Sequence, residues 1–96
     1  MTRKADKAHM DRVASIGCIL CKHLDLGVTP AQIHHIREGQ GMSQRASNFL
    51  VVPLCQTHHT GSPGVHGLGE RGFYTLYKLS ELDLLAMTLE VLQSSK

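Results

Sequence analysis

The chain begins with a run in which apolar side chains recur at helical spacing. A helix is predicted over residues 5 to 16, and Gly17 is a natural stop for it. The apolar positions of this helix are Met10, Val13, Ala14 and Ile16. Two extended segments follow, AQIHHI at 31–36 and NFLVVPL at 48–54, with the flexible connection REGQGMSQRAS between them. The pattern therefore predicts one helix and then a pair of short strands.

The second half of the chain is predicted to be helical. The stretch CQTHHT at 55–60 begins a short helix that ends at Gly61 and Pro63. The glycine-rich segment GSPGVHGLGERG is expected to interrupt the structure before a helix from about residue 72 to 79. A last helix extends this part, so C-terminal helices are predicted over about 72–94.

Ser80 and Asp83 mark the start of the last helix. A serine followed three residues later by an acidic side chain is typical of a helix N-terminus, where each side chain binds the other residue's backbone N–H. Leucines then repeat along one side of this helix, and these are Leu82, Leu85, Leu89 and Leu92. The leucine stripe is predicted to be core or a partner interface and not a site of chemistry.

Length and composition indicate a small domain with few large core residues. A chain of 96 residues is predicted to form a single domain over 1–96, and it buries only a modest share of its surface. Aromatic residues are 4% and tryptophan is absent, so a bound metal would add needed stability. The charged first residues are unlike a signal peptide, and no apolar run is long enough to cross a bilayer. We therefore expect a cytoplasmic protein with no membrane partner.

The cysteines indicate a structural zinc site. Three cysteines in a reducing compartment do not suggest a disulfide framework, since an odd number leaves one unpaired. Cys18 and Cys21 form a C-x-x-C pair, and Cys55 and His58 repeat the spacing as C-x-x-H. This spacing lets two side chains converge on one tetrahedral ion, so the four residues are predicted to bind structural Zn²⁺. The alternative is a thioredoxin-like redox pair, which is disfavoured because no βαβ pattern surrounds the C-x-x-C.

The chain contains two pairs of neighbouring histidines, His34-His35 and His58-His59, and these offer more ligands than one zinc site needs. A zinc ion closed by four protein ligands has no open position for a substrate, so any catalysis would need a second place. Neighbouring residues on a strand face opposite sides, so His34 and His35 cannot do the same job. One can bind a metal while the other works as a base or packs away. Alternatively, a pair of adjacent histidines simply lies on the surface in contact with solvent.

The net charge of +2 is too small for a diffuse basic coat that binds nucleic acid. Most basic side chains nevertheless lie in the first half of the chain, and these include Arg3, Lys4, Lys7, Arg12, Lys22, Arg37 and Arg45. They could form one basic face. Solvated helix surface explains them equally well.

The ordered combination of CILC, IHHI, Asn48 and PLCQTHH resembles the HNH (ββα-metal) endonucleases, in the variety whose finger is stapled by a zinc knuckle. The longer stretch HHIREGQGMSQRASNFLVVPLCQTHHTGSPGVHG is most similar to the recombination-enhancement (Ref-type) nucleases of phages and prophages. The resemblance covers about residues 9 to 77. It implies an α+β fold, in which a small zinc-stapled ββα-metal finger over about 17–66 is flanked by an N-terminal helix and C-terminal helices.

The resemblance also implies a role for each matching residue. His35 matches the general base that takes a proton from the attacking water, and Asn48 matches the middle residue of the motif, which orients that base. His34 and His59 match ligands of one catalytic divalent ion, Mg²⁺, Mn²⁺ or Zn²⁺, which stabilises the phosphorane and the leaving 3′ oxygen. Imidazole suits the role of the base because its pKa lies near neutrality.

The chain departs from the best-known HNH pattern after His59, because Pro63 stands where a further ligand would lie one helical turn on. His66 is the candidate third ligand, since the glycines around it could fold it back towards His59. The alternative is a loop histidine that contacts phosphate or nothing. Arg37 and Arg45 flank the loop between the strands and are predicted to bind DNA phosphates, although ordinary surface charge explains either one alone.

These inferences predict a metal-dependent DNA endonuclease of phage or prophage origin. Its partners would be DNA and, as a candidate, a recombinase filament on single-stranded DNA. The alternative is a zinc-stapled module that binds DNA or a recombinase and has no working nuclease site. The presence of both His34 and His35 together with Asn48 and His59 favours the enzyme, because a purely structural zinc module needs none of them.

Overall fold

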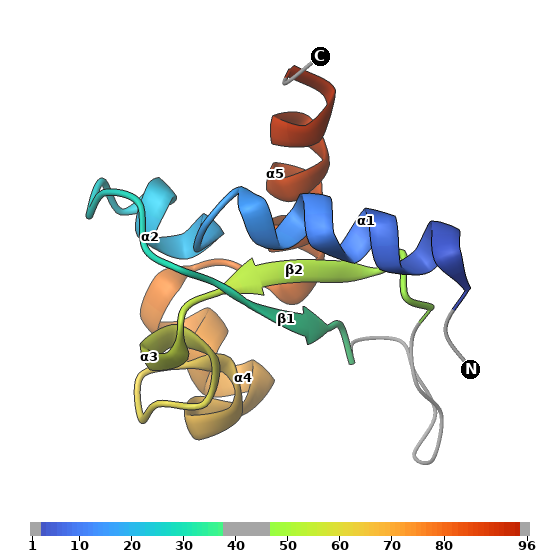
Figure 1. The fold of residues 1–96 in the computed structure, drawn as a ribbon. Helices are drawn as coiled ribbons and strands as arrows, with labels where there is room; N and C mark the ends of the chain where they lie inside the picture. Colours follow the sequence, from blue (N-terminus) through green and yellow to red (C-terminus); the bar gives the residue numbers. More distant parts are fainter. Residues whose placement is uncertain (1–2, 38–46, 95–96) are drawn as a thin grey trace.

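The computed structural model describes residues 3–37 and 47–94, which form an α+β fold (Figure 1). Helix α1 (Lys4–Ser15) is followed by the short helix α2 (Ile19–His23). Strands β1 (Gln32–His35) and β2 (Val51–Leu54) pair as an antiparallel sheet. Helices α3 (Gln56–His59), α4 (Val65–Tyr77) and α5 (Glu81–Ser94) complete the structure. The predicted α+β class is therefore confirmed.

The first elements agree with the periodicity of the sequence. Helix α1 lies within one residue of the predicted bounds and is followed by Gly17, whose φ of +85° favours glycine. Both strands form, although β1 is one residue shorter at each end and β2 starts three residues later than the extended sequence patterns suggested. Helix α2, which contains Cys21 of the C-x-x-C motif, was not predicted. In the described part of the chain, no helix is both long and apolar enough to cross a membrane.

The core lies between the sheet and the helices that cover it. Helix α1 runs along the sheet and contacts both strands, while α5 contacts β2 and α2 (Figure 1). All four residues of β2 are buried, and the core around them includes Leu20, Leu54, Phe73 and Leu84. Strand β1 is less covered, so the sheet offers side chains from β1 both to the interior and to the surface.

The register of the sheet separates the two neighbouring histidines of β1. His34 lies opposite Val52, is only 2% exposed, and contacts Glu81 of α5. His35 lies opposite Val51, is half-buried, and contacts Asn48 just before β2. The expectation that these histidines occupy different environments is confirmed, as the alternation of side chains along a strand requires.

The prediction of a break over residues 61–72 is wrong from Val65 onward, where the chain is helical apart from a kink. Helix α4 begins at Val65 and contains a kink at Gly69, where φ is 74°. A Cβ at Gly64 would lie 2.5 Å from the backbone carbon of His58, and one at Gly67 would lie 2.4 Å from the Gly61 oxygen. These glycines therefore allow α4 to pack closely on the chain around α3, instead of breaking the helix.

The start of α5 was predicted correctly, but its buried face was not. The Ser80 backbone N–H donates to Asp83 Oδ2 at 2.9 Å, and the Asp83 N–H donates to Ser80 Oγ at 3.1 Å, which confirms the capping box. Leu82 and Leu89 are 48% and 43% exposed, so they are not core residues, and the other interpretation of the leucine stripe, a partner interface, stays a prediction for these two. The buried face consists of Glu81, Leu84, Leu85 and Thr88. Glu81 and Thr88 are polar, so the apolar pattern of the sequence did not show that they belong to the buried face.

Candidate metal centres

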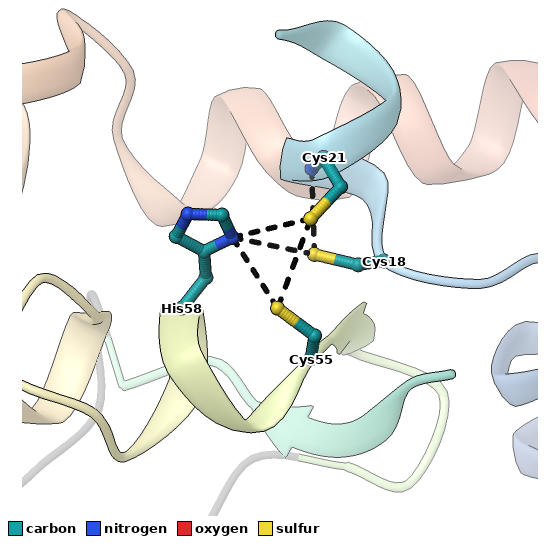
Figure 2. Close-up of side chains that lie close together, drawn as sticks. All are labelled: Cys18, Cys21, Cys55 and His58. Atoms are coloured by element: carbon teal, nitrogen blue, oxygen red, sulfur yellow. Dashed lines mark hydrogen bonds between the residues drawn. The ribbon is translucent and has the colours of Figure 1, made fainter. Parts of the chain in front are cut away.

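Among residues 3–37 and 47–94, two groups of side chains lie close enough together to hold a metal ion. The first consists of the four residues predicted from spacing, Cys18, Cys21, Cys55 and His58. Cys18 caps the N-terminus of α2 and Cys21 lies within that helix, while Cys55 and His58 come from the start and the body of α3. Figure 2 shows the three sulfur atoms and the His58 ring nitrogen turned towards one another. Two short helices thus supply one pair of ligands each.

The distances in this group match a tetrahedral zinc site. Zinc bonds of ~2.3 Å to sulfur and ~2.0–2.1 Å to nitrogen place tetrahedral ligands about 3.8 Å apart for two sulfurs and about 3.6 Å apart for sulfur and nitrogen. The Cys21 and Cys55 sulfurs are 3.8 Å apart. The His58 Nδ1 atom lies 3.4 Å, 3.5 Å and 3.8 Å from the sulfurs of Cys55, Cys21 and Cys18. The group can therefore hold a structural metal with little rearrangement.

The charge environment of this group differs from ligand to ligand. Burial raises the pKa of the Cys18 thiol to about 11. Burial also raises the pKa of Cys55, but the backbone hydrogen bond of His58 and the side-chain contacts with Cys18 and Cys21 together outweigh it and leave the pKa below the usual value. Burial lowers the pKa of His58, which favours the neutral imidazole that binds metals. Cys55 is thus more easily converted than Cys18 to the thiolate that zinc requires.

The second group brings together His34, His59 and His66, from β1, α3 and α4. One ligand atom of each lies within 4.8 Å of the other two. The Nε2 atoms of His59 and His66 are 3.1 Å apart, and the ring of His34 is centred 5.1 Å and 5.0 Å from theirs. Because three imidazole nitrogens converge, this group also suits a divalent ion such as Zn²⁺ or Mn²⁺.

The fold explains why these three histidines meet. His59 follows His58 on α3, so the first metal group fixes the backbone that carries it. The close packing of Gly64 and Gly67 against the chain around α3 brings the first turn of α4, with His66, next to His59. His66 was predicted to reach His59 from a flexible loop. That expectation is wrong, because His66 belongs to a helix.

The pKa values of two members of this group favour the form that can bind a metal. Burial is the main effect that lowers the pKa of His59 to about 4, with smaller contributions from the neighbouring His34 and His66. Burial, His34 and Arg37 also lower the pKa of His66, against an opposing effect of Glu81. Both imidazoles therefore stay neutral near pH 7, and a neutral imidazole has a lone pair to donate to an ion.

In two of these histidines, an oxygen atom of another side chain contacts one of the two ring nitrogens. Gln32 Oε1 lies 2.8 Å from Nδ1 of His59, and Glu81 Oε2 lies 2.5 Å from Nε2 of His34. Histidine ligands usually donate their second ring N–H to a carboxylate or carbonyl oxygen in this way. The arrangement leaves Nδ1 of His34 and Nε2 of His59 to carry the lone pairs. The residues present thus fit a bound cation.

Glu81 was not predicted as part of the site. It is 3% exposed, and its second oxygen accepts a hydrogen bond of 2.8 Å from the backbone N–H of Arg37. It lies 47 residues from His34 along the chain, and no local motif marks a contact of that separation. The side chain of Arg37 is exposed, while Arg45 lies outside the described residues.

His35 follows His34 on β1 and belongs to a separate series of hydrogen bonds. Its Nε2 atom is 2.8 Å from Asn48 Oδ1. The Asn48 amide nitrogen donates in turn to Asp6 Oδ2 at 3.1 Å. The structure therefore brings His35 and Asn48 together, as the resemblance implied, and adds Asp6 from α1, which sequence reasoning missed.

Comparison with known proteins agrees with the resemblance to the Ref-type nucleases. No curated protein matches the chain. A family model described as recombination enhancement, RecA-dependent nuclease matches residues 3–93. This match includes both groups of metal-binding side chains and the hydrogen-bonded chain at His35. Because it spans almost the whole sequence, the chain belongs to the family of recombination-enhancement, RecA-dependent nucleases.

Proposed function

We propose that this family member is a metal-dependent DNA endonuclease of the HNH (ββα-metal) type, of phage or prophage origin. The observation that carries the proposal is the convergence of His34, His59 and His66, with His35 as the residue that follows His34 on β1. The order of β1, β2 and α3, with His34 and His35 on the first strand and His59 on the helix, supports a ββα-metal finger. Three converging imidazoles, with a further histidine next to one of them along β1, combine an ion site with a base.

In the proposed reaction, His35 removes a proton from the water that attacks the phosphorus atom. Asn48 orients the imidazole through its contact with Nε2. His34, His59 and His66 would hold the catalytic ion, which would supply stabilisation for the negative charge that develops at phosphorus and on the leaving 3′ oxygen. The first group, Cys18, Cys21, Cys55 and His58, would bind structural Zn²⁺ and fix α3.

The proposed substrate follows from the family, whose description names RecA dependence. We propose DNA as the substrate and a recombinase filament on single-stranded DNA as the partner. To test this, the purified chain is offered supercoiled plasmid, single-stranded DNA and DNA in a recombinase filament, each with Mg²⁺, Mn²⁺ or Zn²⁺. Cleavage that requires an added ion supports the enzyme. Binding without cleavage in every combination favours the alternative, a module that only binds DNA or the recombinase.

Changing Glu81 to glutamine is expected to weaken binding of the catalytic ion. The amide can accept from His34 or from the Arg37 N–H but cannot serve both as the carboxylate does. Loss of such a supporting partner typically costs about 10–100-fold in metal affinity or activity. Calorimetric titration of the zinc-loaded chain with Mn²⁺ measures the effect. Glu90→Gln, on the exposed side of the same helix, is the control, and equal affinity in both variants would contradict the role of Glu81.

Changing Arg37 to alanine is expected to weaken DNA binding equally for unrelated sequences. The substitution removes the exposed side chain but leaves the backbone N–H that Glu81 accepts, so the site keeps this contact. Loss of one phosphate contact lowers the slope of log affinity against log salt by about 0.9 for duplex DNA. The control is Arg12→Ala in the last turn of α1. An unchanged salt slope would make Arg37 ordinary surface charge.

A further inference from the structure

Asp6 is a buried acidic residue that lies outside both metal groups. It is 8% exposed although it comes from the first turn of α1, where acidic side chains are normally solvated. One carboxylate oxygen accepts a hydrogen bond from Arg3 at 3.3 Å, and the other accepts from the Asn48 amide nitrogen at 3.1 Å. Asp6 thus links the N-terminal helix to the residue that contacts His35.

The chemistry of Asp6, Asn48 and His35 determines which group donates in each hydrogen bond of the series that links them. The Asp6 carboxylate, paired with Arg3, offers only acceptor atoms, so Asn48 must turn its NH₂ group towards it. The Asn48 oxygen then faces His35. Because a carbonyl oxygen has no proton to give, the ring nitrogen Nε2 of His35 must be the donor in the 2.8 Å contact.

We propose that Asp6 is a positioning residue that acts through Asn48 to place the ring proton of His35 on Nε2. A neutral imidazole has one N–H, so the lone pair then lies on Nδ1. The opposite orientation of the Asn48 amide would point NH₂ at Nε2 and favour the proton on Nδ1. A hydrogen bond to a charged group is roughly twice as strong as a neutral one, which is why the carboxylate decides the orientation.

The proposal rests on the proposed function, since the position of the lone pair matters for catalysis only if His35 is the base. It can nevertheless be tested without cleavage. Long-range ¹H–¹⁵N NMR spectra of the zinc-loaded chain, recorded without DNA at about pH 8 where imidazole is neutral, report which nitrogen of His35 carries the proton. The unmodified chain is expected to show the Nε2–H form. A proton on Nδ1 in that chain would overturn the proposal, whether or not any variant folds.

Three variants separate the orienting role from a structural one. Asp6→Ala is expected to give a mixture of both ring forms, because the Asn48 amide is then able to turn over. Asp6→Asn should largely keep the Nε2–H form, since its own oxygen can accept from Asn48. Asp11→Ala, on the same helix but exposed, is the control and should leave His35 unchanged. A folded Asp6→Ala chain with only the Nε2–H form would make Asp6 a purely structural residue.

Cleavage rates complete the test. At saturating catalytic ion, Asp6→Ala is expected to cleave about 10–100-fold more slowly, the usual scale for loss of a residue that orients an active group, while its DNA affinity stays unchanged. Asp6→Asn should recover most of the rate. Equal rates for Asp6→Ala and Asp11→Ala, alongside mixed ring forms, would overturn the link from Asp6 to catalysis. If the unmodified chain cuts no DNA, the proposed function fails, and the NMR result still decides whether Asp6 orients His35.

Discussion

Replacing Cys55 with alanine is expected to unfold the domain and abolish tight zinc binding. Cys55 is 5% exposed, contacts both Cys21 and His58, and has a thiol whose pKa is lowered. Structural zinc binds zinc-finger peptides with about 10–16 kcal/mol, comparable with the net stability of about 5–15 kcal/mol of a whole domain. A chain with few large core residues has little else to compensate for this loss.

Circular dichroism on heating and metal analysis of the purified protein measure this effect. The matched control is Thr57→Ala on the same short helix, where the side chain is exposed and no metal contact is removed. The control is expected to keep one tightly bound zinc per chain and the thermal transition of the unmodified protein. A Cys55→Ala protein with unchanged zinc content and thermal stability would rule out the four-ligand structural site.

Replacing His35 with alanine is expected to leave the fold and both metal groups intact but to slow DNA cleavage by about 10²-fold or more. The imidazole is half-buried at the end of β1 and belongs to neither metal group, so its removal disturbs no ligand. The size of the effect is that of a general base. Single-turnover cleavage at saturating metal, with DNA affinity measured separately, tests this expectation. His23→Ala, an exposed histidine on α2, is the control.

Substitution of His59 separates the base from the ligands. His59→Ala removes one member of the second group, so cleavage should be lost at low metal concentration and recover in part as metal is added. His35→Ala should show no such recovery. Recovery of cleavage by both variants to the same extent would mean that the roles of base and ligand have been assigned to the wrong histidines. Near-normal cleavage by His35→Ala at saturating metal would refute the proposed mechanism.

Residues close together in sequence were the most predictable part of this site. The zinc group follows from two spacings of three residues, and each spacing lies on one short helix whose geometry brings both ligands to the same side. The capping box at Ser80 is equally local. The separate environments of His34 and His35 follow from the alternation of a strand. In each case the physical rule acts within a few residues.

The parts that sequence reasoning missed depend on tertiary contacts. In the sequence, Asp6 and Glu81 are indistinguishable from ordinary charged residues on helix surfaces. The packing of α1 against the sheet brings Asp6 to Asn48, and the packing of α5 brings Glu81 to His34. The same packing makes Glu81 part of the buried face of α5 and leaves Leu82 on the surface. The glycines near His66 suggested a loop, because the close approach that they allow cannot be seen in a single segment.

The most direct test of the account is the metal dependence of cleavage by the unmodified chain. Protein that contains one zinc per chain is freed of other ions and assembled with DNA in a recombinase filament, and cleavage is followed as Mg²⁺ or Mn²⁺ is added. The account predicts no cleavage at the start and a rate that rises and saturates as one further ion binds per chain. Absence of cleavage at every concentration of every divalent ion, in a folded chain that binds the filament, would contradict it.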